Sequence, residues 1–593
     1  MLIAHKILTD SIQKALQELY NINSTNVFFQ KTRKEFEGDL TLVTFPFAKD
    51  SKKSPEQLGN ELGEYLKKNE SNVSDFNVVK GFLNISFTNS FWLKYFDKIK
   101  NEEKVGFKFP GSSNRNIMLE YSSPNTNKPL HLGHIRNNLL GYSVANILKA
   151  NGHHVIKTNL VNDRGIHICK SMLAWKKFGN GETPESSGMK GDHLVGKYYV
   201  AFDKAYKVEI TKLIEQGKTK EIAEKTAPLM VECQEMLVQW EAGNKEVKEL
   251  WQTMNGWVYD GFAKTYNILG VDFDKMYFES NTYLFGKEHV MEGLNRGIFY
   301  RKENGSIAID LTADGLDEKV VMRGDGTSIY ITQDIGTAIE RFKEFSQLNQ
   351  LIYTVGNEQD FHFKVLFKIL EKLGYAWAKE CYHLSYGMVE LPDGKMKSRE
   401  GTVVDADDLL EEMFRTSEET TKELGKVEGF GEEELQKLYK TIGLGALKYF
   451  MLKVDPKKKM LFDPKESIDF NGHTGPFIQY THARIKSVLR KADLLYEKSI
   501  DKIELNELER ELIKWLYGFE EAIEEAGKLY NPSLVANYIY EMVKCYNRFF
   551  HEHSILKEEN LDVKIFRIQL SKACGQTIAN GMGLLGIEVP ERM

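Results

Sequence analysis

The spacing of apolar and polar residues changes several times along the chain and divides it into four regions. At the start, Ile12, Leu16 and Leu19 are spaced as on one face of a helix. Two stretches, 40–47 and 78–87, then alternate apolar and polar residues as half-buried strands do. We therefore predict a small α+β module over residues 1–112.

The second region opens with the pattern of a β-α-β unit. Apolar runs at 117–121 and 155–161 have the length of buried strands. Between them lie a turn at 122–127 and a helical stretch at about 131–151. Such units build parallel sheets with right-handed crossovers. A nucleotide-binding sheet is therefore expected to begin here.

From about 163 to 285 the pattern is helical and charged, which predicts an insertion between two halves of that fold. Strand and helix patterns then resume, so we predict a Rossmann-like domain over 113–404. Its later elements are predicted as strands 306–311, 320–323, 328–332, 351–355 and 383–390, a helix after Asp334, a helix at 361–373 and a loop at 393–402.

The remainder of the chain reads almost entirely as helix. We predict a connecting helical segment over 405–470 and a helical domain over 471–593, where apolar residues recur every four positions from Leu534 to Phe550. The predicted fold class is therefore multidomain α/β: a Rossmann-like core, a small N-terminal α+β module and a C-terminal all-α bundle.

Composition narrows the class of protein. The 593 residues are 42% hydrophobic and 28% charged, as in ordinary globular proteins, and the formal charge of −6 excludes a uniformly basic surface. Five widely spaced cysteines without a C-x-x-C pair argue against a disulfide framework and fit the cytoplasm. No apolar run approaches the ~18 residues of a membrane span.

The strongest chemical motif is the stretch Ser122-Ser-Pro-Asn-Thr-Asn-Lys-Pro-Leu-His131-Leu-Gly-His134, between a predicted strand and a predicted helix. The first turn of a helix has unpaired N–H groups that attract polyphosphate. Gly133 would allow a nucleotide to approach closely, and His131 and His134 share one helix face, where both can donate to a reacting phosphate. The alternative is a capping or metal-binding pair; we expect no protein-bound metal.

These residues resemble the class I aminoacyl-tRNA synthetases, whose first β-α turn carries His-x-Gly-His, and Glu120-Tyr-Ser-Ser-Pro-Asn125-x-x-Lys128-Pro-x-His131 resembles the arginyl-tRNA synthetase family in particular. Further similar stretches span the chain: Tyr330-Ile-Thr-Gln-Asp334, Gly356-Asn-Glu-Gln359-Asp-x-His362, Pro476-Phe-Ile-Gln-Tyr480-Thr-His-Ala-Arg484 and Gly586-Ile-Glu-Val-Pro-Glu-Arg-Met593. The resemblance implies ATP-dependent activation of L-arginine and its transfer to tRNA.

A second signature of the class is a lysine-rich loop, and Gly394-Lys395-Met396-Lys397-Ser398-Arg399-Glu-Gly401 follows the fifth predicted strand. The class pattern is Lys-Met-Ser-Lys-Ser, so Ser398 stands where its second lysine is expected. In the arginyl family Lys128, ahead of the histidine motif, would replace that lysine. The resemblance thus assigns catalysis to Lys128, His131, His134, Lys395 and Lys397, and ATP binding to His131, Gly133, His134, Lys395 and Met396.

Selection of arginine requires carboxylates, because a guanidinium is planar, charged and best held by bidentate acceptors. Glu120, at the end of the first strand of the nucleotide fold, and Asp334, predicted at a strand end before a helix, lie where open α/β sheets bind ligands. By resemblance, Ser122, Asn125, Tyr330 and Gln359 complete the arginine site. Each acid taken alone could equally be a helix cap or one partner of a surface ion pair.

Recognition of single-stranded RNA uses stacking on aromatic rings. By resemblance, Tyr480, Tyr546, Phe550 and Met593 contact the anticodon arm. The N-terminal module is expected to contact the tRNA elbow, and a purely structural role is the alternative. An aromatic stripe at helical spacing can equally be core, and this alternative stays open for Tyr546 and Phe550.

The expected partners are tRNA(Arg), L-arginine and ATP with substrate-bound Mg²⁺, and the protein is expected to be a cytoplasmic monomer that contacts no membrane. Three alternatives remain: another class I synthetase, a non-catalytic tRNA-binding paralogue, and a small nucleotidylyltransferase. The paralogue would be expected to lack Lys128, His131 or His134. The nucleotidylyltransferase would not need the terminal helical domain.

Overall fold

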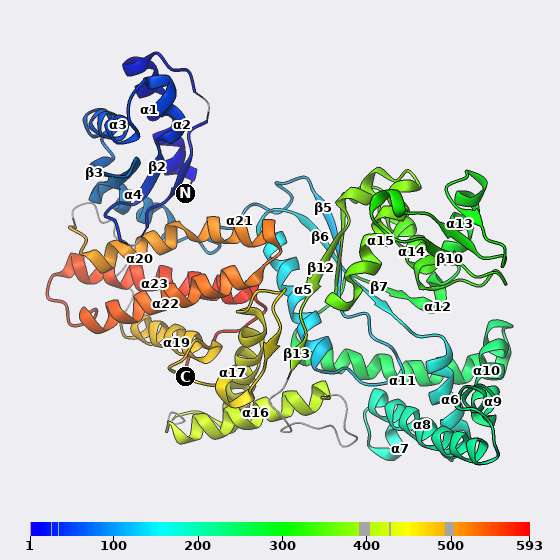
Figure 1. Cartoon of the computed structure of the whole chain (residues 1–593). Helices are drawn as coiled ribbons and strands as arrows, with labels where there is room; N and C mark the ends of the chain where they lie inside the picture. The colour runs from blue at the N-terminus through cyan, green and yellow to red at the C-terminus, as the bar shows by residue number, and fades with distance from the viewer. Residues whose placement is uncertain (1, 25, 34, 391–403, 426–428, 493–502) are drawn as a thin grey trace.

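The computed structural model of the protein describes residues 2–24, 26–33, 35–390, 404–425, 429–492 and 503–593. Figure 1 shows a small N-terminal module in blue, an α/β domain in cyan to green and a set of helices in yellow to red. The module lies against the C-terminal helices and away from the central sheet. None of the helices in these ranges combines the length and apolar character of a membrane span.

The α/β domain is built on a five-stranded sheet in the order β12-β11-β5-β6-β7, and every neighbouring pair is parallel. β5 is the central strand, so the turn that follows it opens at the middle of the carboxyl edge. The strands are β5 (Asn116–Glu120), β6 (His154–Val161), β7 (Lys275–Phe278), β11 (Gln350–Gly356) and β12 (Tyr382–Tyr386).

Helices cover both faces of this sheet, and β5 alternates between them. Ile117 and Leu119 belong to the core that includes Leu140 and Val144 of α5 (Leu132–Ala150). Met118 belongs to the opposite core, with α14 (Tyr330–Glu344) and α15 (Asp360–Lys372). Because side chains of a strand alternate, Glu120 lies on the same face as Met118, toward α14.

The predicted strand 328–332 is wrong, because α14 begins at Tyr330. Ile331, Ile335 and Ile339 are all buried, and their spacing of four residues forms a helical stripe against the sheet. The hydroxyl of Thr332 accepts from the backbone N–H of Ile329 at 2.9 Å and so starts the helix. Asp334 therefore lies inside the first turns of α14, and not at a strand end as predicted.

The predicted strands 306–311 and 320–323 both exist, the first shortened and the second shifted by one residue, but they belong to a separate antiparallel sheet with the order β10-β9-β8. Its strands are β8 (Tyr300–Arg301), β9 (Ile307–Ile309) and β10 (Lys319–Met322). The predicted strand 383–390 is divided at Gly387 into β12 and β13 (Val389–Glu390), and β13 pairs with β14 (Met460–Leu461).

The stretch predicted as a helical insertion is helical except for β7, which returns to the edge of the main sheet. Two long helices, α8 and α11, pack against each other; a Cβ on Gly191 of α8 would lie 2.0 Å from the carbonyl oxygen of Trp257 of α11. The helices here are α6 (Ile166–Phe178), α7 (Pro184–Ser187), α8 (Gly191–Glu215), α9 (Lys220–Thr226), α10 (Pro228–Glu241), α11 (Lys245–Leu269), α12 (Glu279–Thr282) and α13 (Phe285–Asn295).

The N-terminal module has an antiparallel sheet in the order β1-β2-β4-β3. Its last helix reaches the C-terminal helices through Trp92, whose ring centroid lies 5.6 Å from that of Tyr517. Asp39 forms an ion pair with Lys514 across the same junction. The elements are α1 (Leu2–Tyr20), β1 (Phe29–Lys31), β2 (Leu40–Val43), α2 (Phe45–Ser51), α3 (Pro55–Asn69), β3 (Val73–Val79), β4 (Phe82–Phe87) and α4 (Asn89–Ile99).

The C-terminal helices pack against the outer side of α5. Ser143 of α5 donates to the carbonyl oxygen of Leu584 at 3.0 Å, and Asn151 donates to that of Ile523 at 2.9 Å. The helices are α16 (Ala406–Glu423), α17 (Glu432–Leu452), α18 (Pro464–Ser467), α19 (Gly475–Lys491), α20 (Glu507–Tyr517), α21 (Phe519–Leu529), α22 (Pro532–Glu552) and α23 (Leu561–Leu584). Helix α5 thus lies between the sheet and this domain.

Candidate active site

The histidine motif forms the N-terminal cap of α5, at the carboxyl end of the central strand. Nδ1 of His131 accepts from the backbone N–H of Gly133, and Nδ1 of His134 accepts from the backbone N–H of His131, both at 3.1 Å. The two ring centroids lie 3.8 Å apart. Because each Nδ1 is an acceptor, the proton of each neutral ring is on Nε2, which remains a hydrogen-bond donor.

Burial keeps both imidazoles neutral. Burial, and then the nearby Lys128 ammonium, lower the pKa of His131 to about 4. Burial, followed by the charges of His131 and Lys128, holds the pKa of His134 well below the usual value. Burial also lowers the pKa of Lys128, which makes no hydrogen bond or ion pair with any described residue. A neutral pair of donors and a partly buried ammonium therefore meet at one helix N-terminus.

The segment that follows the predicted lysine-rich loop is hydrogen-bonded to the histidine motif. The backbone N–H of Leu132 donates to the carbonyl oxygen of Val404, and that of Ala406 donates to the carbonyl oxygen of Leu130, both at 3.0 Å. Asp405 is thereby bridged to His131. The predicted Lys395, Met396 and Lys397 lie outside the described residues.

Three of the residues predicted to bind arginine lie at or just before the N-terminal turns of α14 and α15. Asp334 accepts from Nε2 of His362 at 2.7 Å. Tyr330 lies one helical turn before Asp334 and is 79% exposed. Gln359 is exposed in the short turn that follows β11.

The structure gives Glu120 a partner that the sequence did not indicate. Its carboxylate forms a buried ion pair with Arg341 of α14, on the sheet face that the alternation of β5 selects. A second hydrogen bond comes from the hydroxyl of Ser123 at 3.3 Å. The carboxylate of Glu120 is therefore already paired with a guanidinium of the chain itself, and its predicted role in binding arginine stays a prediction.

Ser122 and Asn125 occupy different environments. Ser122 is buried, and its hydroxyl is hydrogen-bonded to that of Tyr266 at 2.6 Å. It therefore holds the turn to α11, and its side chain is already paired. Asn125 is exposed and pairs through its backbone with Asn162 after β6.

Glu279 is an acidic residue that the sequence analysis missed. It is the first residue of α12, immediately after β7 at the carboxyl edge. Burial raises its pKa to about 7; Arg164 lowers it, whereas Asp163 and Asp334 raise it further. The signal was the four-residue run Lys275–Phe278 followed by an acid, hidden in a stretch read as helical. Glu279 and Asp334 thus place two acidic groups close enough to interact at the carboxyl edge of the sheet.

In the helical domain, three of the four predicted tRNA contacts lie near one another. Tyr480 and Met593 line a cavity of about 430 Å³ with Arg484. The guanidinium carbon of Arg484 lies 5.0 Å from the ring centroid of Tyr480 and 5.1 Å from that of Phe550. The prediction for Tyr546 is wrong, because this ring is fully buried and its hydroxyl is bonded to Ser571 at 3.1 Å, so no base can stack on it.

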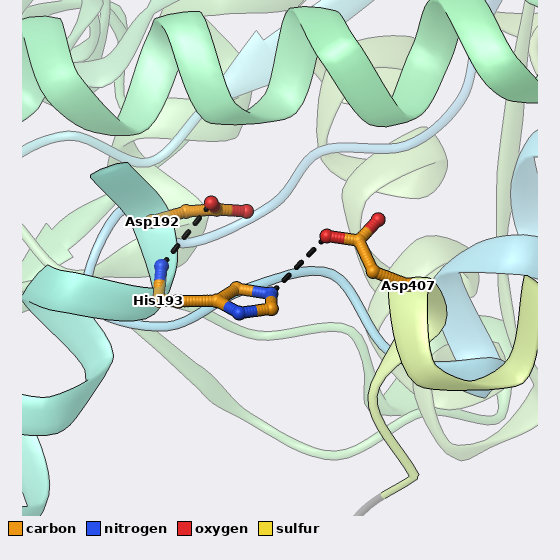
Figure 2. A group of neighbouring side chains, drawn as sticks. All are labelled: Asp192, His193 and Asp407. Atoms are coloured by element: carbon orange, nitrogen blue, oxygen red, sulfur yellow. Dashed lines mark hydrogen bonds and ion pairs between the residues drawn. The ribbon is translucent and has the colours of Figure 1, made fainter. Parts of the chain in front are cut away.

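One further polar group lies next to the motif. Among the described residues, Asp192, His193 and Asp407 form the one set of three side chains whose ligand atoms are close enough to share a metal ion (Figure 2). The ammonium of Lys190 lies 3.1 Å from Asp192 and 2.6 Å from Asp407. The carboxylates are therefore already neutralised by a cation of the protein.

Comparison with known proteins identifies the family. A family model described as "tRNA synthetases class I (R), catalytic domain" matches residues 98–463. Proteins named arginine–tRNA ligase from Flavobacterium psychrophilum and Bacteroides thetaiotaomicron are each 59% identical, and each alignment covers 99% of both chains. The chain belongs to the arginyl-tRNA synthetase family. The family predicted from the motifs is thus confirmed.

Both end regions also match domains of this family. The arginyl-tRNA synthetase N-terminal domain matches residues 6–87, and the DALR anticodon-binding domain matches residues 478–593. The solved structure of Thermus thermophilus arginyl-tRNA synthetase has a TM-score of 0.80 and 25% identity, covering 99% of this chain and all of that one. The predicted fold class is confirmed, and the predicted boundaries at 112, 404 and 470 stay predictions.

Proposed function

We propose that the protein activates L-arginine with ATP and transfers the arginyl group to the terminal ribose of tRNA(Arg), releasing pyrophosphate and AMP. The observation that carries this proposal is the His131–His134 cap beside Lys128, in a chain 59% identical over its length to arginine–tRNA ligases. The motif distinguishes it from a paralogue without catalysis, since all three side chains are present.

The site suits an in-line attack that needs position and positive charge more than acid-base catalysis. The arginine carboxylate is already ionised and attacks the α-phosphorus of ATP. Nε2 of His131 and of His134 donate to phosphate oxygens beside Gly133, and Lys128 adds charge as pyrophosphate leaves. By resemblance, Lys395, Met396 and Lys397 adjoin the same phosphates.

Mg²⁺ is proposed to arrive with ATP and to neutralise phosphate charge. The one set of three potential metal ligands among the described residues is already paired with the Lys190 ammonium, so this set does not suit a resident cation. Phosphate oxygens are therefore its expected ligands, with water completing the shell.

We propose that Asp334 and Glu279 accept hydrogen bonds from the substrate guanidinium. Asp334 is oriented by His362, and Tyr330 offers a ring one turn away. Binding a cation would favour the ionised form of Glu279, whose pKa of about 7 is raised chiefly by burial. Glu120, Ser122, Asn125 and Gln359 are proposed to shape the rest of the arginine site, Glu120 through its pair with Arg341.

The helical domain is proposed to read the anticodon of tRNA. The cavity lined by Tyr480, Arg484 and Met593, with Phe550 beside Arg484, combines rings with a planar cation, the groups on which unpaired bases stack. A cytoplasmic location and a monomeric state stay predictions.

ATP–pyrophosphate exchange across a panel of amino acids, with and without tRNA, tests the proposal. We expect efficient exchange with arginine alone, because analogues that leave buried acceptors unpaired are rejected strongly. Efficient exchange with lysine, glutamine or cysteine would contradict it, and would favour another class I synthetase.

A further inference from the structure

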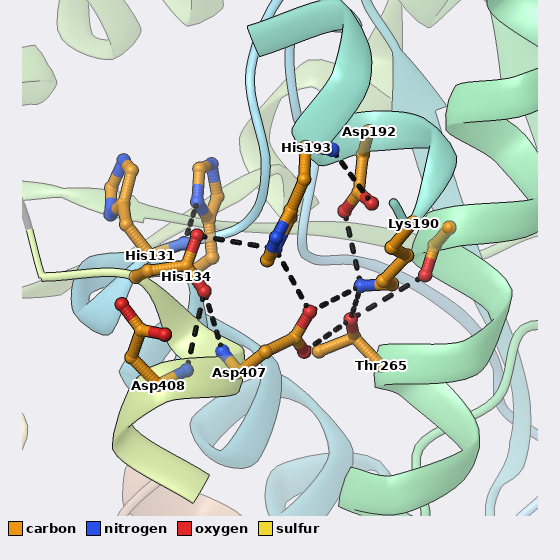
Figure 3. Close-up of polar contacts among 10 residues, drawn as sticks. His131, His134, Lys190, Asp192, His193, Thr265, Asp407 and Asp408 are labelled. Carbon is orange, nitrogen blue, oxygen red and sulfur yellow. Dashed lines mark hydrogen bonds and ion pairs between the residues drawn. The ribbon is translucent and has the colours of Figure 1, made fainter. Parts of the chain in front are cut away.

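A network of charged side chains joins the helical insertion to the segment that braces the histidine motif (Figure 3). Lys190, at the N-cap of α8, donates to Asp192 at 3.1 Å, to Thr265 of α11 at 2.5 Å and to Asp407 of α16 at 2.6 Å. Asp407 also accepts from the hydroxyl of Thr265 at 2.9 Å. Three helices that are far apart in the sequence therefore meet at one ammonium.

His193, in the first turn of α8, makes the second connection. Its Nε2 lies 3.1 Å from Asp407 and 3.4 Å from Asp405. Burial alone would lower the pKa of His193, but the two carboxylates raise it to about 10. His193 is thus a cation at neutral pH, and the network contains two cations and three carboxylates.

Asp405 carries the connection into the active site. Its side chain caps α16 by accepting from the backbone N–H of Asp407 at 2.8 Å. Its own backbone lies between Val404 and Ala406, which hydrogen-bond to Leu132 and Leu130 on either side of His131. A shift of Asp405 would therefore be passed to the ring that caps α5.

The same part of α8 also contacts the other side of the motif. A Cβ on Gly196 would lie 2.9 Å from Cδ of Pro129 and 3.7 Å from Cα of Lys128. Two cations at the N-terminal end of a helix oppose its dipole, so their cost is offset by the carboxylates that they hold in place. This arrangement does little to stabilise α8, but it can hold the segment around Asp405 and Asp407 in a fixed position.

We infer that His193 and Lys190 are positioning residues, which hold residues 404–407 against the histidine motif and thereby fix His131 for the reaction with ATP. The inference rests on the proposed role of His131. Displacement of a reacting group by about 1 Å can cost on the order of 100-fold in rate, so loss of the network should act on kcat.

The kinetic test compares His193→Ala and Lys190→Met with Lys197→Met, an exposed lysine on the same helix that pairs with Glu182 outside the network. Rates of ATP–pyrophosphate exchange are divided by the number of active sites from adenylate burst titration, which removes the effect of unfolded protein. We expect kcat to fall at least tenfold in the first two variants, KM for ATP to change less than threefold, and Lys190→Arg to recover most of the rate.

A double-variant cycle asks whether the effect passes through His131. In a His131→Ala background, His193→Ala should reduce kcat less than twofold further, because the group being positioned is already absent. An undiminished tenfold loss in that background would overturn the inference, as would a kcat for His193→Ala equal to that of Lys197→Met.

Hydrogen–deuterium exchange provides a measurement that does not depend on activity. In His193→Ala, but not in Lys197→Met, the amides of Leu132 and Ala406 should exchange at least tenfold faster, because their hydrogen bonds join the segment that the network holds to the histidine motif. Unchanged exchange at both amides overturns the inference. If instead the parent protein fails to exchange pyrophosphate with arginine, the proposed function fails, while this measurement still decides the structural coupling.

Discussion

At the scale of single residues, the two histidines owe their chemistry to hydrogen bonds with the backbone. Each Nδ1 is occupied by a backbone N–H, which fixes the tautomer, and burial keeps each ring neutral. They can donate to phosphate without binding an extra proton, and the positive charge of the site falls to Lys128. In this turn, the two neutral rings thus supply hydrogen bonds and Lys128 supplies the positive charge.

Lys128 should act mainly in the transition state. We expect Lys128→Ala to lower kcat for ATP–pyrophosphate exchange by ~10² to 10³, the usual loss for one preorganised donor, with a smaller change in KM for ATP. Lys149→Ala, an exposed lysine near the other end of α5, is the control. If Lys128→Ala is nearly silent while Lys397→Ala abolishes exchange, the role belongs to the loop.

Protonation of His131 should destabilise the fold. Its pKa is about 4 in the folded protein against a usual 6.5, so the unfolded chain binds the extra proton first as pH falls. The stabilisation is complete above pH 6.5 and is lost progressively toward pH 4, by about 2 kcal/mol at pH 5. His131→Asn keeps a capping acceptor that does not titrate.

Urea unfolding at pH 7 and pH 5 measures this difference. The parent should lose about 2 kcal/mol more than His131→Asn between the two values. Equal losses would mean that the ring titrates normally in the folded state.

At the scale of elements, the sequence predicted correctly the strands and helices that have a clear pattern of apolar and polar residues. Strands β5 and β6 and helix α5 were found within one or two residues, because a buried strand and a long amphipathic helix have distinct patterns. The segment 328–332 was misread, since its apolar and β-branched residues favour strands until Ile335 and Ile339 are seen to continue a helical stripe. Likewise Tyr546 matched the spacing of the tRNA-contact candidates but faces the core.

The acids of the site show a different reason for failure. Glu120 and Asp334 were found from motifs, whereas Arg341, which neutralises Glu120, is 221 residues away in the sequence. Glu279 was missed because β7 has only four residues. A pairing such as that of Glu120 with Arg341 depends on how α14 packs on the sheet, which no local pattern contains.

The contact between α5 and Tyr121, the residue that follows β5, should be sensitive to a single methyl group. A Cβ on Gly141 would lie 2.4 Å from Cβ of Tyr121, so Gly141→Ala should destabilise the protein by about 1–3 kcal/mol. Gly256→Ala in α11 is the matched control, since no atom lies within 4 Å of its added Cβ and alanine favours helix by up to ~1 kcal/mol. Thermal and urea unfolding should show lower stability for Gly141→Ala and higher stability for Gly256→Ala. A shift of both variants in the same direction would refute the packing argument.

At the scale of the whole molecule, α5 connects the two functional regions. Its N-terminus carries the histidine motif, and its outer side packs on α17, α21 and α23 of the helical domain. The cavity lined by Tyr480 belongs to that domain, remote in the sequence from the ATP motif. Recognition of tRNA and chemistry on ATP should therefore be separable by substitution.

We expect Tyr480→Ala and Phe550→Ala to raise KM for tRNA in aminoacylation by 10- to 100-fold, as a lost stacking contact of ~1–3 kcal/mol predicts, and to leave KM for ATP unchanged. Tyr546→Phe, which removes only a buried hydroxyl, is the control and should charge tRNA normally. Altering the anticodon of the tRNA should reduce charging by a smaller factor in the first two variants than in the parent, because these variants have already lost a contact to the anticodon. Equal discrimination in all variants would place anticodon reading elsewhere.

The order of strands in the central sheet also has a consequence for folding during synthesis on the ribosome. β5 is flanked by β6, made soon after it, and by β11, whose first residue, Gln350, lies about 230 residues beyond Glu120. At ~5–20 residues per second, a ribosome needs roughly 10–50 s to cover that distance. Throughout this interval one edge of the central strand has no partner, so the nascent chain exposes a strand edge to which chaperones can bind or from which aggregation can start.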